Sequence, residues 1–323
     1  MSASSQFSFP VFNYAVGWWR HQPATPLSFI APVVKVDGQM GTFKRYPQGS
    51  VYRAVDTRRA RLNPYNSIDL EAEDVPYLLE DHGLRIGVDD SEIKLGAGDK
   101  KEATDQIAQS RMGSLLGTWR TSMISAGFDV FRSAVTATTS IGSISDIGQW
   151  SGASNEPVKG LRAVVNQFAA NNGVYPNRFL FSKGAWDILG ANASILDLIA
   201  YNDAKVLTPE LLLKLLDLTG DDVSQDIKIM RAIVPVGKSK PGPGVAFEGE
   251  DMMSSDVWIT YAEDVQSTSD ISGLKTLSIG GEDMVESVET YYVQQDHATW
   301  YEVAMARQFV VSAPSAVTRL TIS

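Results

Sequence analysis

The sequence has no cysteine and only three histidines in 323 residues. Without cysteine the chain can form neither disulfides nor sulfur-ligated metal sites, and it has no thiolate nucleophile. The histidines, His21, His82 and His297, do not occur in an H-E-x-x-H pair, and no G-x-S-x-G sequence is present. We therefore expect no enzyme active site, no cofactor and no bound metal. A catalytic triad that only the fold assembles is the remaining enzymatic alternative.

Two further absences narrow the class of partner. No stretch approaches the roughly 18 consecutive apolar residues of a transmembrane helix, so we expect no membrane partner. The 28 Lys and Arg residues are outnumbered by 38 Asp and Glu residues, which gives a net charge of −10. Tight nucleic-acid binding needs concentrated basic side chains, so we expect any DNA to be contacted non-specifically.

Residues 7–19 are rich in apolar and aromatic side chains, but they lack the basic start and the small-residue cleavage pattern of a secretory signal. We interpret them as an arm that packs on another surface, with Trp18 and Trp19 as candidate contact residues. Base stacking on single-stranded nucleic acid is a weaker interpretation of these two rings, because no basic groove accompanies them.

Charge is segregated between residues 44 and 92. The first part is opposed only by Asp56 and contains six basic residues: Lys44, Arg45, Arg53, Arg58, Arg59 and Arg61. The second part, 69–92, is acidic except for Arg85 and includes Glu71, Glu73 and Asp74. Such a segment can fold back as a hairpin, pair with the opposite charges of a second copy, or present two solvated faces. The six basic residues and Glu71, Glu73 and Asp74 are our candidate contacts between copies.

Residues 99–127 have the pattern of a long helix. Apolar residues recur at spacings of three and four, which places them on one face: Ile107, Met112, Leu115, Leu116, Trp119, Met123 and Ile124. Asp99 is a suitable N-cap and Gly127 a suitable terminator. Gly113 and Gly117 each cost about 1 kcal/mol of helix propensity, so they mark a close approach, a bend or a tolerated weakness.

The rest of the chain predicts a mixed fold. After a connection rich in Ser, Thr and Gly at 136–155, we expect helices at 155–173, around 186–189, at 195–201 and at 208–220, with strands at 178–182 and 227–236. The last third is mostly strand, at 257–261, 274–279, 285–293, 300–311 and 317–322. The predicted class is α+β.

Two candidate ligand sites are weak. Gly237-Lys238-Ser239 copies the end of a phosphate-binding loop, but Ala232 stands where that motif needs glycine and the following Pro/Gly-rich residues cannot open a helix. Asp89, Asp90 and Glu92 lack the alternating ligands and turn glycine of a calcium-binding loop, so we interpret them as a solvated acidic loop.

The order of these segments resembles that of the major capsid proteins of tailed bacteriophages, which have the Hong Kong 97-type capsid fold. The resemblance covers nearly the whole chain. It is carried by the apolar arm at 7–30, the charged excursion at 41–88, the long helix at 100–126, the stretch YPNRFLFSKGAW at 175–186, and the closing strands with YEVAMA at 301–306 and FVV at 309–311.

The resemblance implies a division of the chain and a function. The divisions are an N-terminal arm (1–40), an extended β-hairpin loop (41–98), a peripheral domain with the spine helix (99–155), an α/β axial domain (156–236) and return strands (237–323). The function is that of a structural subunit, assembled in the host cytoplasm into the pentamers and hexamers of an icosahedral virion shell that packages double-stranded DNA.

The same resemblance implies further partners and one alternative. Portal and decoration proteins are expected partners. Because the long helix already begins near residue 100, with no long assembly segment before it, we expect a separate scaffolding protein or none. No residue matches the Lys–Asn crosslink of some family members, so we expect no crosslink. An encapsulin-type container has the same fold and is the other non-enzymatic interpretation.

Overall fold

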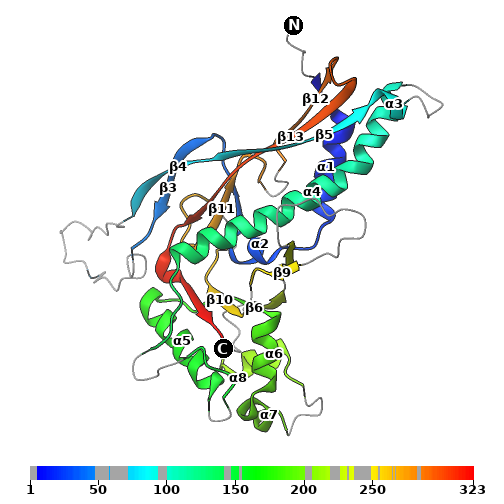
Figure 1. The fold of residues 1–323 in the computed structure, drawn as a ribbon. Coiled ribbons are helices and arrows are strands. Elements are labelled where there is room, and N and C mark those ends of the chain that lie inside the picture. Colours follow the sequence, from blue (N-terminus) through cyan, green and yellow to red (C-terminus); the bar gives the residue numbers. More distant parts are fainter. Residues whose placement is uncertain are drawn as a thin grey trace.

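The structure is a computed structural model, which describes residues 6–47, 58, 72–93, 100–141, 147–152, 155–200, 206–218, 226–230, 233–235, 249–253, 255–263, 265, 267–281 and 285–323. An elongated part, built on a six-stranded sheet, carries the long helix α4 along its length, and a smaller part built on a four-stranded sheet lies beneath it (Figure 1). This mixture of helices and sheets confirms the predicted α+β class.

The predicted long helix is α4, Lys100–Ala134. Its buried stripe includes Met112, Leu116 and Trp119, as the spacing predicted. The predicted end at Gly127 is wrong, because the helix continues to Ala134. Gly127 is needed for packing instead: a Cβ atom there would lie 2.6 Å from the side chain of Leu27, which is buried against the helix.

The N-terminal arm forms two helices, α1 (Phe9–His21) and α2 (Pro26–Ile30), and α1 packs along α4. Gly113 marks the close approach, since a Cβ atom there would lie 3.4 Å from the Tyr14 hydroxyl and 3.5 Å from Trp18 Nε1. Gly117 has no atom of the described chain within 4 Å of such a position, so in the single chain it is a tolerated weakness.

The first sheet has the order β1-β12-β13-β11-β2, with β5 on the other side of β13. Its strands are β1 (Gln6–Phe7), β2 (Val33–Lys35), β5 (Glu80–Asp89), β11 (Leu274–Ser278), β12 (Ser287–Val293) and β13 (Ala298–Val311). Residues 80–89, placed by the sequence in the extended loop, therefore form a strand of this sheet. The strands predicted in the last third are confirmed to within two residues at each end.

The two faces of the first sheet are covered by different elements. Successive residues of a strand face opposite sides. Met305 of β13 belongs to the core beneath α4, whereas Ala306 packs in a separate cluster with Phe43 and Tyr77. The latter two residues come from the hairpin of β3 (Met40–Arg45) and β4 (Glu73–Leu78). The hairpin thus covers the face opposite to α4 at this end of the sheet.

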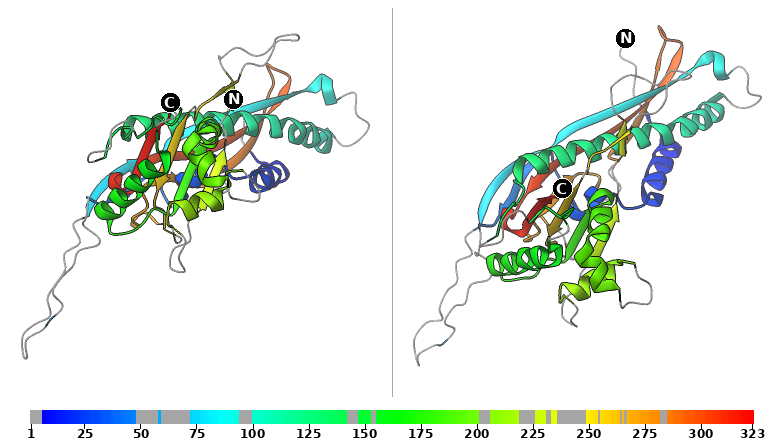
Figure 2. Two further views of the ribbon diagram at one scale, coloured as in Figure 1. Left: turned by 90° about the horizontal axis from the view of Figure 1, so that it is seen from below. Right: turned by 60° about the horizontal axis from the view of Figure 1, so that its bottom comes forward.

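The second sheet has the order β14-β10-β6-β7 and packs against four helices (Figure 2). Its strands are β6 (Arg178–Ser182), β7 (Asp226–Met230), β10 (Asp256–Thr260) and β14 (Val317–Thr321), and the helices are α5 (Pro157–Asn172), α6 (Lys183–Ala191), α7 (Ala193–Ile199) and α8 (Pro209–Leu215). Strand β10 joins the two parts: Val257 and Ile259 lie in the second core, whereas the Trp258 ring packs 6.1 Å from that of Phe128 in α4.

Three predicted boundaries in this part change. The N-cap of α5 is Glu156 and not Asn155, whose side chain instead donates to the Gln149 carbonyl at 2.6 Å. The predicted strand 227–236 is two strands, β7 and β8 (Ile233–Pro235), and β8 pairs with β9 (Gly249–Asp251) in a separate ribbon. Helix α8 already ends at Leu215, and its predicted stop, Gly220, lies outside the described residues.

Candidate inter-subunit surfaces

The β3–β4 hairpin brings the basic and acidic limbs of the charged segment together. In its antiparallel register Lys44 faces Asp74 and Arg45 faces Glu73. The Lys44 Nζ lies 2.8 Å from Asp74 Oδ1, and the two side chains are 39% and 57% exposed. An exposed pair of this kind is worth about 0–1 kcal/mol, so it adds little to stability. At these four residues the segment folds back on itself, which was one of the three alternatives that its charge pattern allowed.

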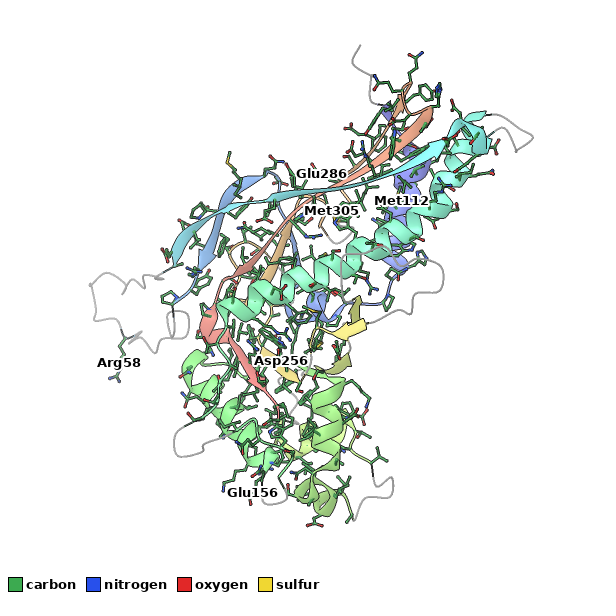
Figure 3. The ribbon with its side chains drawn as sticks, viewed as in Figure 1. Arg58, Met112, Glu156, Asp256, Glu286 and Met305 are labelled. Carbon is green, nitrogen blue, oxygen red and sulfur yellow. The ribbon has the colours of Figure 1, made fainter. Side chains whose placement is uncertain are left out.

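The other candidate contacts lie beyond these strands. Arg58 is exposed and stands well away from the body of the molecule (Figure 3). Arg53, Arg59, Arg61 and Glu71 lie outside the described residues. The role of the nine charged residues as contacts between copies therefore stays a prediction.

The outer face of the hairpin carries an exposed apolar pair that the sequence analysis missed. Met40 and Leu78 face each other across the two strands, and 76% and 60% of their surfaces are exposed. Their neighbours Gly41 and Tyr77 face inward, and Tyr77 covers the glycine so closely that a Cβ atom there would lie 2.5 Å from its hydroxyl. Only the strand register reveals that Met40 and Leu78 share the outer face.

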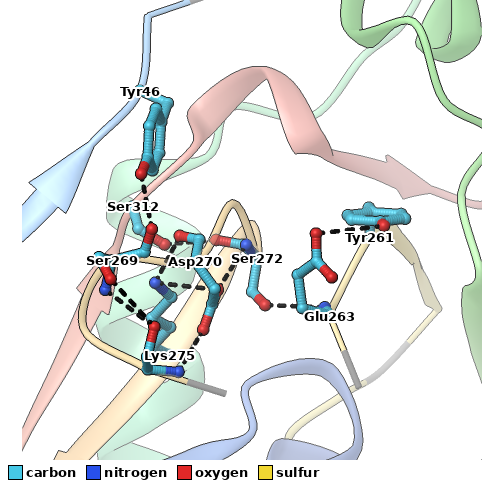
Figure 4. Close-up of polar contacts among 9 residues, drawn as sticks. Tyr46, Tyr261, Glu263, Ser269, Asp270, Ser272, Lys275 and Ser312 are labelled. Carbon is cyan, nitrogen blue, oxygen red and sulfur yellow. Dashed lines mark hydrogen bonds and ion pairs between the residues drawn. The ribbon is translucent and has the colours of Figure 1, made fainter. Parts of the chain in front are cut away.

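The base of the hairpin is fixed to a loop between β10 and β11 (Figure 4). The Tyr46 hydroxyl donates to the Ser269 carbonyl at 2.6 Å, and its backbone N–H donates to the Ser312 carbonyl at 3.0 Å. The Lys44 N–H donates to the Thr268 carbonyl at 2.9 Å. Burial, and the nearby charge of Asp270, raise the pKa of Tyr46, which keeps this hydroxyl a donor.

A buried ion pair holds that loop in place. The Lys275 side chain is fully buried, and its Nζ lies 3.0 Å from Asp270 Oδ1 and donates to the Asp270 carbonyl at 2.7 Å. The same carboxylate accepts the N–H groups of Ser267 and Ser272 at 2.6 and 2.7 Å. Burial lowers the pKa of Lys275, and the Asp270 charge opposes that shift. The projecting hairpin therefore has a rigid attachment, beside a hollow of about 620 Å³ that Arg45, Tyr46 and Pro314 help to line.

The two predicted aromatic contacts of the arm pack within the chain. Trp18 and Trp19 lie on α1, are half-buried, and contact the core beneath α4. Their ring centroids are 5.9 Å apart. This packing accounts for much of their apolar surface without a second copy, and their part in contacts between copies stays a prediction.

A second hollow, of about 640 Å³, lies at the end of the first sheet where the arm begins. Two phenols there donate to carboxylates: Tyr301 to Asp105 at 2.6 Å and Tyr292 to Asp90 at 2.7 Å. Burial and the hydrogen bond to Asp105 raise the pKa of Tyr301. The sequence analysis missed this site, because its acids lie on α3 (Asp90–Ile93) and α4 while its tyrosines lie on β12 and β13.

The described residues hold no metal-ligand cluster. Among them, no three His, Asp or Glu side chains are placed to hold a metal ion. The acids expected in a solvated loop lie instead at the end of β5 and in α3: Asp89 accepts the Ser91 N–H, Asp90 accepts from the Tyr292 hydroxyl, and Glu92 pairs with Arg111 at 2.6 Å. His82 lies on β5 opposite Met305 of β13, and its Nε2 is 3.8 Å from a carboxylate oxygen of Glu80. The triplet Gly237-Lys238-Ser239 lies outside the described residues.

Across the helices that the structure describes, none is long and apolar enough to cross a bilayer.

Comparisons with known proteins identify the fold. No family model and no curated protein matches the sequence. Among solved structures, a phage-related protein from Bordetella bronchiseptica RB50 superposes with a TM-score of 0.66 at 17% identity, over 98% of this chain and 97% of that one. A protein described as a prophage capsid protein of Escherichia coli CFT073 superposes with a TM-score of 0.51 at 11% identity, over 99% and 100% of the two chains. The chain therefore has the fold of phage capsid proteins, as its segment order predicted.

Proposed function

We propose that the chain is a structural subunit of a phage capsid and acts by binding copies of itself. The observation that carries this proposal is the fold over nearly the whole chain, with a charged hairpin that projects from one end of an elongated body. A protein with that shape, whose described residues hold no cluster suited to a metal ion, is suited to contacts between copies.

The finer proposal is a closed shell. Copies join head to tail into pentamers and hexamers, which close into an icosahedral shell around double-stranded DNA, assembled in the host cytoplasm and retained in the virion. A scaffolding protein, a portal and decoration proteins are proposed further partners. The five divisions at 1–40, 41–98, 99–155, 156–236 and 237–323 are proposed as the arm, extended loop, peripheral domain, axial domain and return strands of such a subunit.

The physical basis is a heterologous interface, in which one surface of a copy contacts a different surface of the next copy. Such an interface generates rings when its rotation closes. Single exposed ion pairs are worth about 0–1 kcal/mol, so the strength of a shell must come from many repeated contacts and from apolar burial. Met40 and Leu78 on the hairpin, and Phe7 and Phe9 on the arm, are exposed apolar residues available for that burial.

Charge reversal in the segment between β3 and β4 tests this proposal. The variant Arg58→Glu, Arg59→Glu, Arg61→Glu should keep the circular dichroism of the wild type while its large particles disappear from sedimentation velocity profiles. The matched control replaces the same three residues with lysine, which keeps the charge and should keep the particles. If the glutamate variant assembles as well as the wild type, pairing through these three basic residues is wrong; if the wild type itself stays monomeric, the shell proposal is wrong.

A further inference from the structure

Strand β5 is a long border strand of the first sheet. One of its edges pairs with β13 along its whole length, in a continuous register. No strand among the described residues pairs with its other edge. In the right-hand view of Figure 2, β5 is the cyan strand along the outer border of the elongated part. Such an edge presents backbone donors and acceptors that can pair with another chain, and β5 carries neither the proline nor the bulge that often prevents this.

The register with β13 shows which backbone groups of β5 point to the open edge. The Asp90 N–H, which continues this register, donates to the His297 carbonyl at 2.9 Å. In an antiparallel ladder such hydrogen-bonded pairs alternate with pairs that are not bonded. The backbone groups of even-numbered residues therefore point to β13, and those of odd-numbered residues point to the open edge. The Gly87 carbonyl agrees with this assignment, because it accepts from the Arg111 guanidinium at 2.7 Å.

Contacts within the chain close both ends of the open edge. At one end the Leu79 N–H donates to the Gln39 carbonyl at 2.8 Å, and at the other end Arg111 occupies the Gly87 carbonyl. Between these ends lie the three residues whose outward backbone groups pair with no strand of the described chain: Asp81, Gly83 and Arg85. The free part of the edge is therefore short and is centred on Gly83.

Gly83 is not required by the packing of its own chain. A Cβ atom there would lie 3.7 Å from the Val303 carbonyl, which is an ordinary contact, whereas a Cβ atom at Gly87 would lie only 3.2 Å from the Trp300 ring. Gly83 is also exposed. Glycine weakens a strand, and inside a strand it often marks the close approach of another backbone. Gly83 therefore indicates an approach from outside the described chain.

We propose that the open edges of β5 from two copies pair antiparallel about a two-fold axis at Gly83. Only the self-pairing centred there uses free groups alone, because a shift in either direction brings in the bonded groups of Leu79 or Gly87. In this register Asp81 of each copy faces Arg85 of the other, so opposite charges meet on both sides of the axis. Each of the three outward pairs can exchange two backbone hydrogen bonds.

The two charged side chains keep capacity for this contact. The Arg85 guanidinium lies 4.5 Å from the centre of the Trp300 ring, and its Nη1 is 3.4 Å from the Tyr291 hydroxyl. Arg85 is exposed, so its long side chain can turn toward the edge, where its five N–H donors exceed what these contacts use. Asp81 accepts one hydrogen bond from Gln39 at 2.8 Å and has further acceptor positions.

This two-fold contact is isologous, whereas the contact within the rings of the proposed function is head to tail. Head-to-tail contacts close copies into a ring, and separate rings need a further contact to join them. A two-fold contact on the border of the elongated part supplies that contact. It also places His82 of one copy opposite the exposed Leu84 of the other. The inference rests on the proposed self-assembly and names the residues of one contact between rings.

One cysteine per chain tests the two-fold geometry, because the natural sequence has none. Gly83→Cys places two thiols opposite each other at the axis. Assembled particles treated with a short bis-maleimide should therefore give linked dimers on a denaturing gel and no higher ladder, since a single cysteine cannot link within its own chain. The matched control Asp89→Cys lies on the same strand with its backbone toward the same edge. Pairing centred on Gly83 holds its two thiols roughly 40 Å apart, so it should give no dimers.

Exchange of the two charges tests the register. In the Gly83→Cys background, Arg85→Asp places two carboxylates opposite each other and should lower the yield of linked dimers several-fold. Addition of Asp81→Arg to that variant restores opposite charges and should restore the yield. An undiminished yield with Arg85→Asp alone, or no recovery in the exchanged variant, contradicts this register.

Hydrogen exchange of the wild type decides the question if Gly83→Cys does not assemble. The amides of Gly83 and Arg85 should exchange freely in the monomer and be protected in the particles. Unprotected amides in the particles, or assembled Gly83→Cys particles without linked dimers, overturn the inference and leave the proposed function intact. A wild type that forms no particles contradicts both.

Discussion

The carboxylate of Asp256 lies 2.9 Å from the guanidinium of Arg132, and this ion pair fastens the long helix α4 to the second sheet. Arg319 on β14 approaches the same carboxylate at 3.3 Å, and Thr321 donates to its other oxygen at 3.1 Å. Asp256 is almost completely buried, with 3% of its side chain exposed. Asp256, on β10, thus links α4 of the elongated part to β14 of the second sheet.

Replacing Asp256 with alanine should destabilise the folded chain by about 3 kcal/mol, because it leaves two partly buried guanidinium groups without their counter-charge. Urea unfolding of the monomer measures this loss. Asp187→Ala is the control, since it removes an exposed pair with Lys183 and should cost about 0–1 kcal/mol. Equal losses in the two variants would show that Asp256 does not join the two parts.

Two glycines of α4 should respond in opposite directions to alanine. Gly117→Ala should stabilise the monomer by about 1 kcal/mol, because it improves helix propensity and meets no neighbouring atom. Gly127→Ala should destabilise it by about 1–3 kcal/mol, because its Cβ would press on the buried Leu27. Thermal or urea unfolding measures both, and a stabilising Gly127→Ala would contradict the packing role assigned to that glycine.

This pair of glycines illustrates how far the sequence could predict the fold. The periodicity of α4 and the strands of the last third depend on local patterns, and they were predicted well. The continuation of α4 past Gly127 depends on Leu27, a hundred residues earlier in the chain, so no local pattern contains it. The break between β7 and β8 likewise depends on pairing with β9.

His82 should make stability depend on pH in the acidic range. Burial lowers its pKa, and the positive charge of Arg307 lowers it further, against the opposing charges of Glu80 and Asp81. The folded chain therefore binds this proton less readily than the unfolded chain, whose histidine has a pKa of about 6.5. Stability from this source is complete above that pH and is lost as the pH falls below it.

The variant His82→Gln should accordingly lose less stability than the wild type between pH 7.5 and pH 5.5 in urea unfolding. His21→Gln is the control, because His21 is exposed and only its Nδ1 contacts the Gly17 carbonyl. Parallel losses in the wild type and His82→Gln would show that His82 does not contribute to this pH dependence.

The attachment of the hairpin should depend on the buried ion pair beneath it. Asp270→Ala leaves the fully buried Lys275 without its counter-charge and removes two backbone hydrogen bonds, so it should cost about 3–5 kcal/mol. Hydrogen exchange at the amides of Lys44 and Tyr46, which bond to this loop and to Ser312, should accelerate at the same time. Asp74→Ala removes only the exposed pair with Lys44, and those amides should then keep their protection.

The candidate surfaces were harder to predict than the fold. Segregated charge left a hairpin as one of three alternatives, and the structure shows that Lys44 and Asp74 pair across two adjacent strands. Met40 with Leu78, and Asp105 with Tyr301, are joined only by strand register and by packing between distant segments. A lysine in an alternating strand would be predicted on the exposed face. No local pattern indicates that Lys275 is buried in an ion pair with Asp270.

Electron microscopy of the purified chain, negatively stained and combined with light scattering, tests the central claim most directly. The account predicts closed shells, or rings of five and six subunits, that are lost when Arg58, Arg59 and Arg61 are all reversed to glutamate. A folded monomer at every concentration would contradict it.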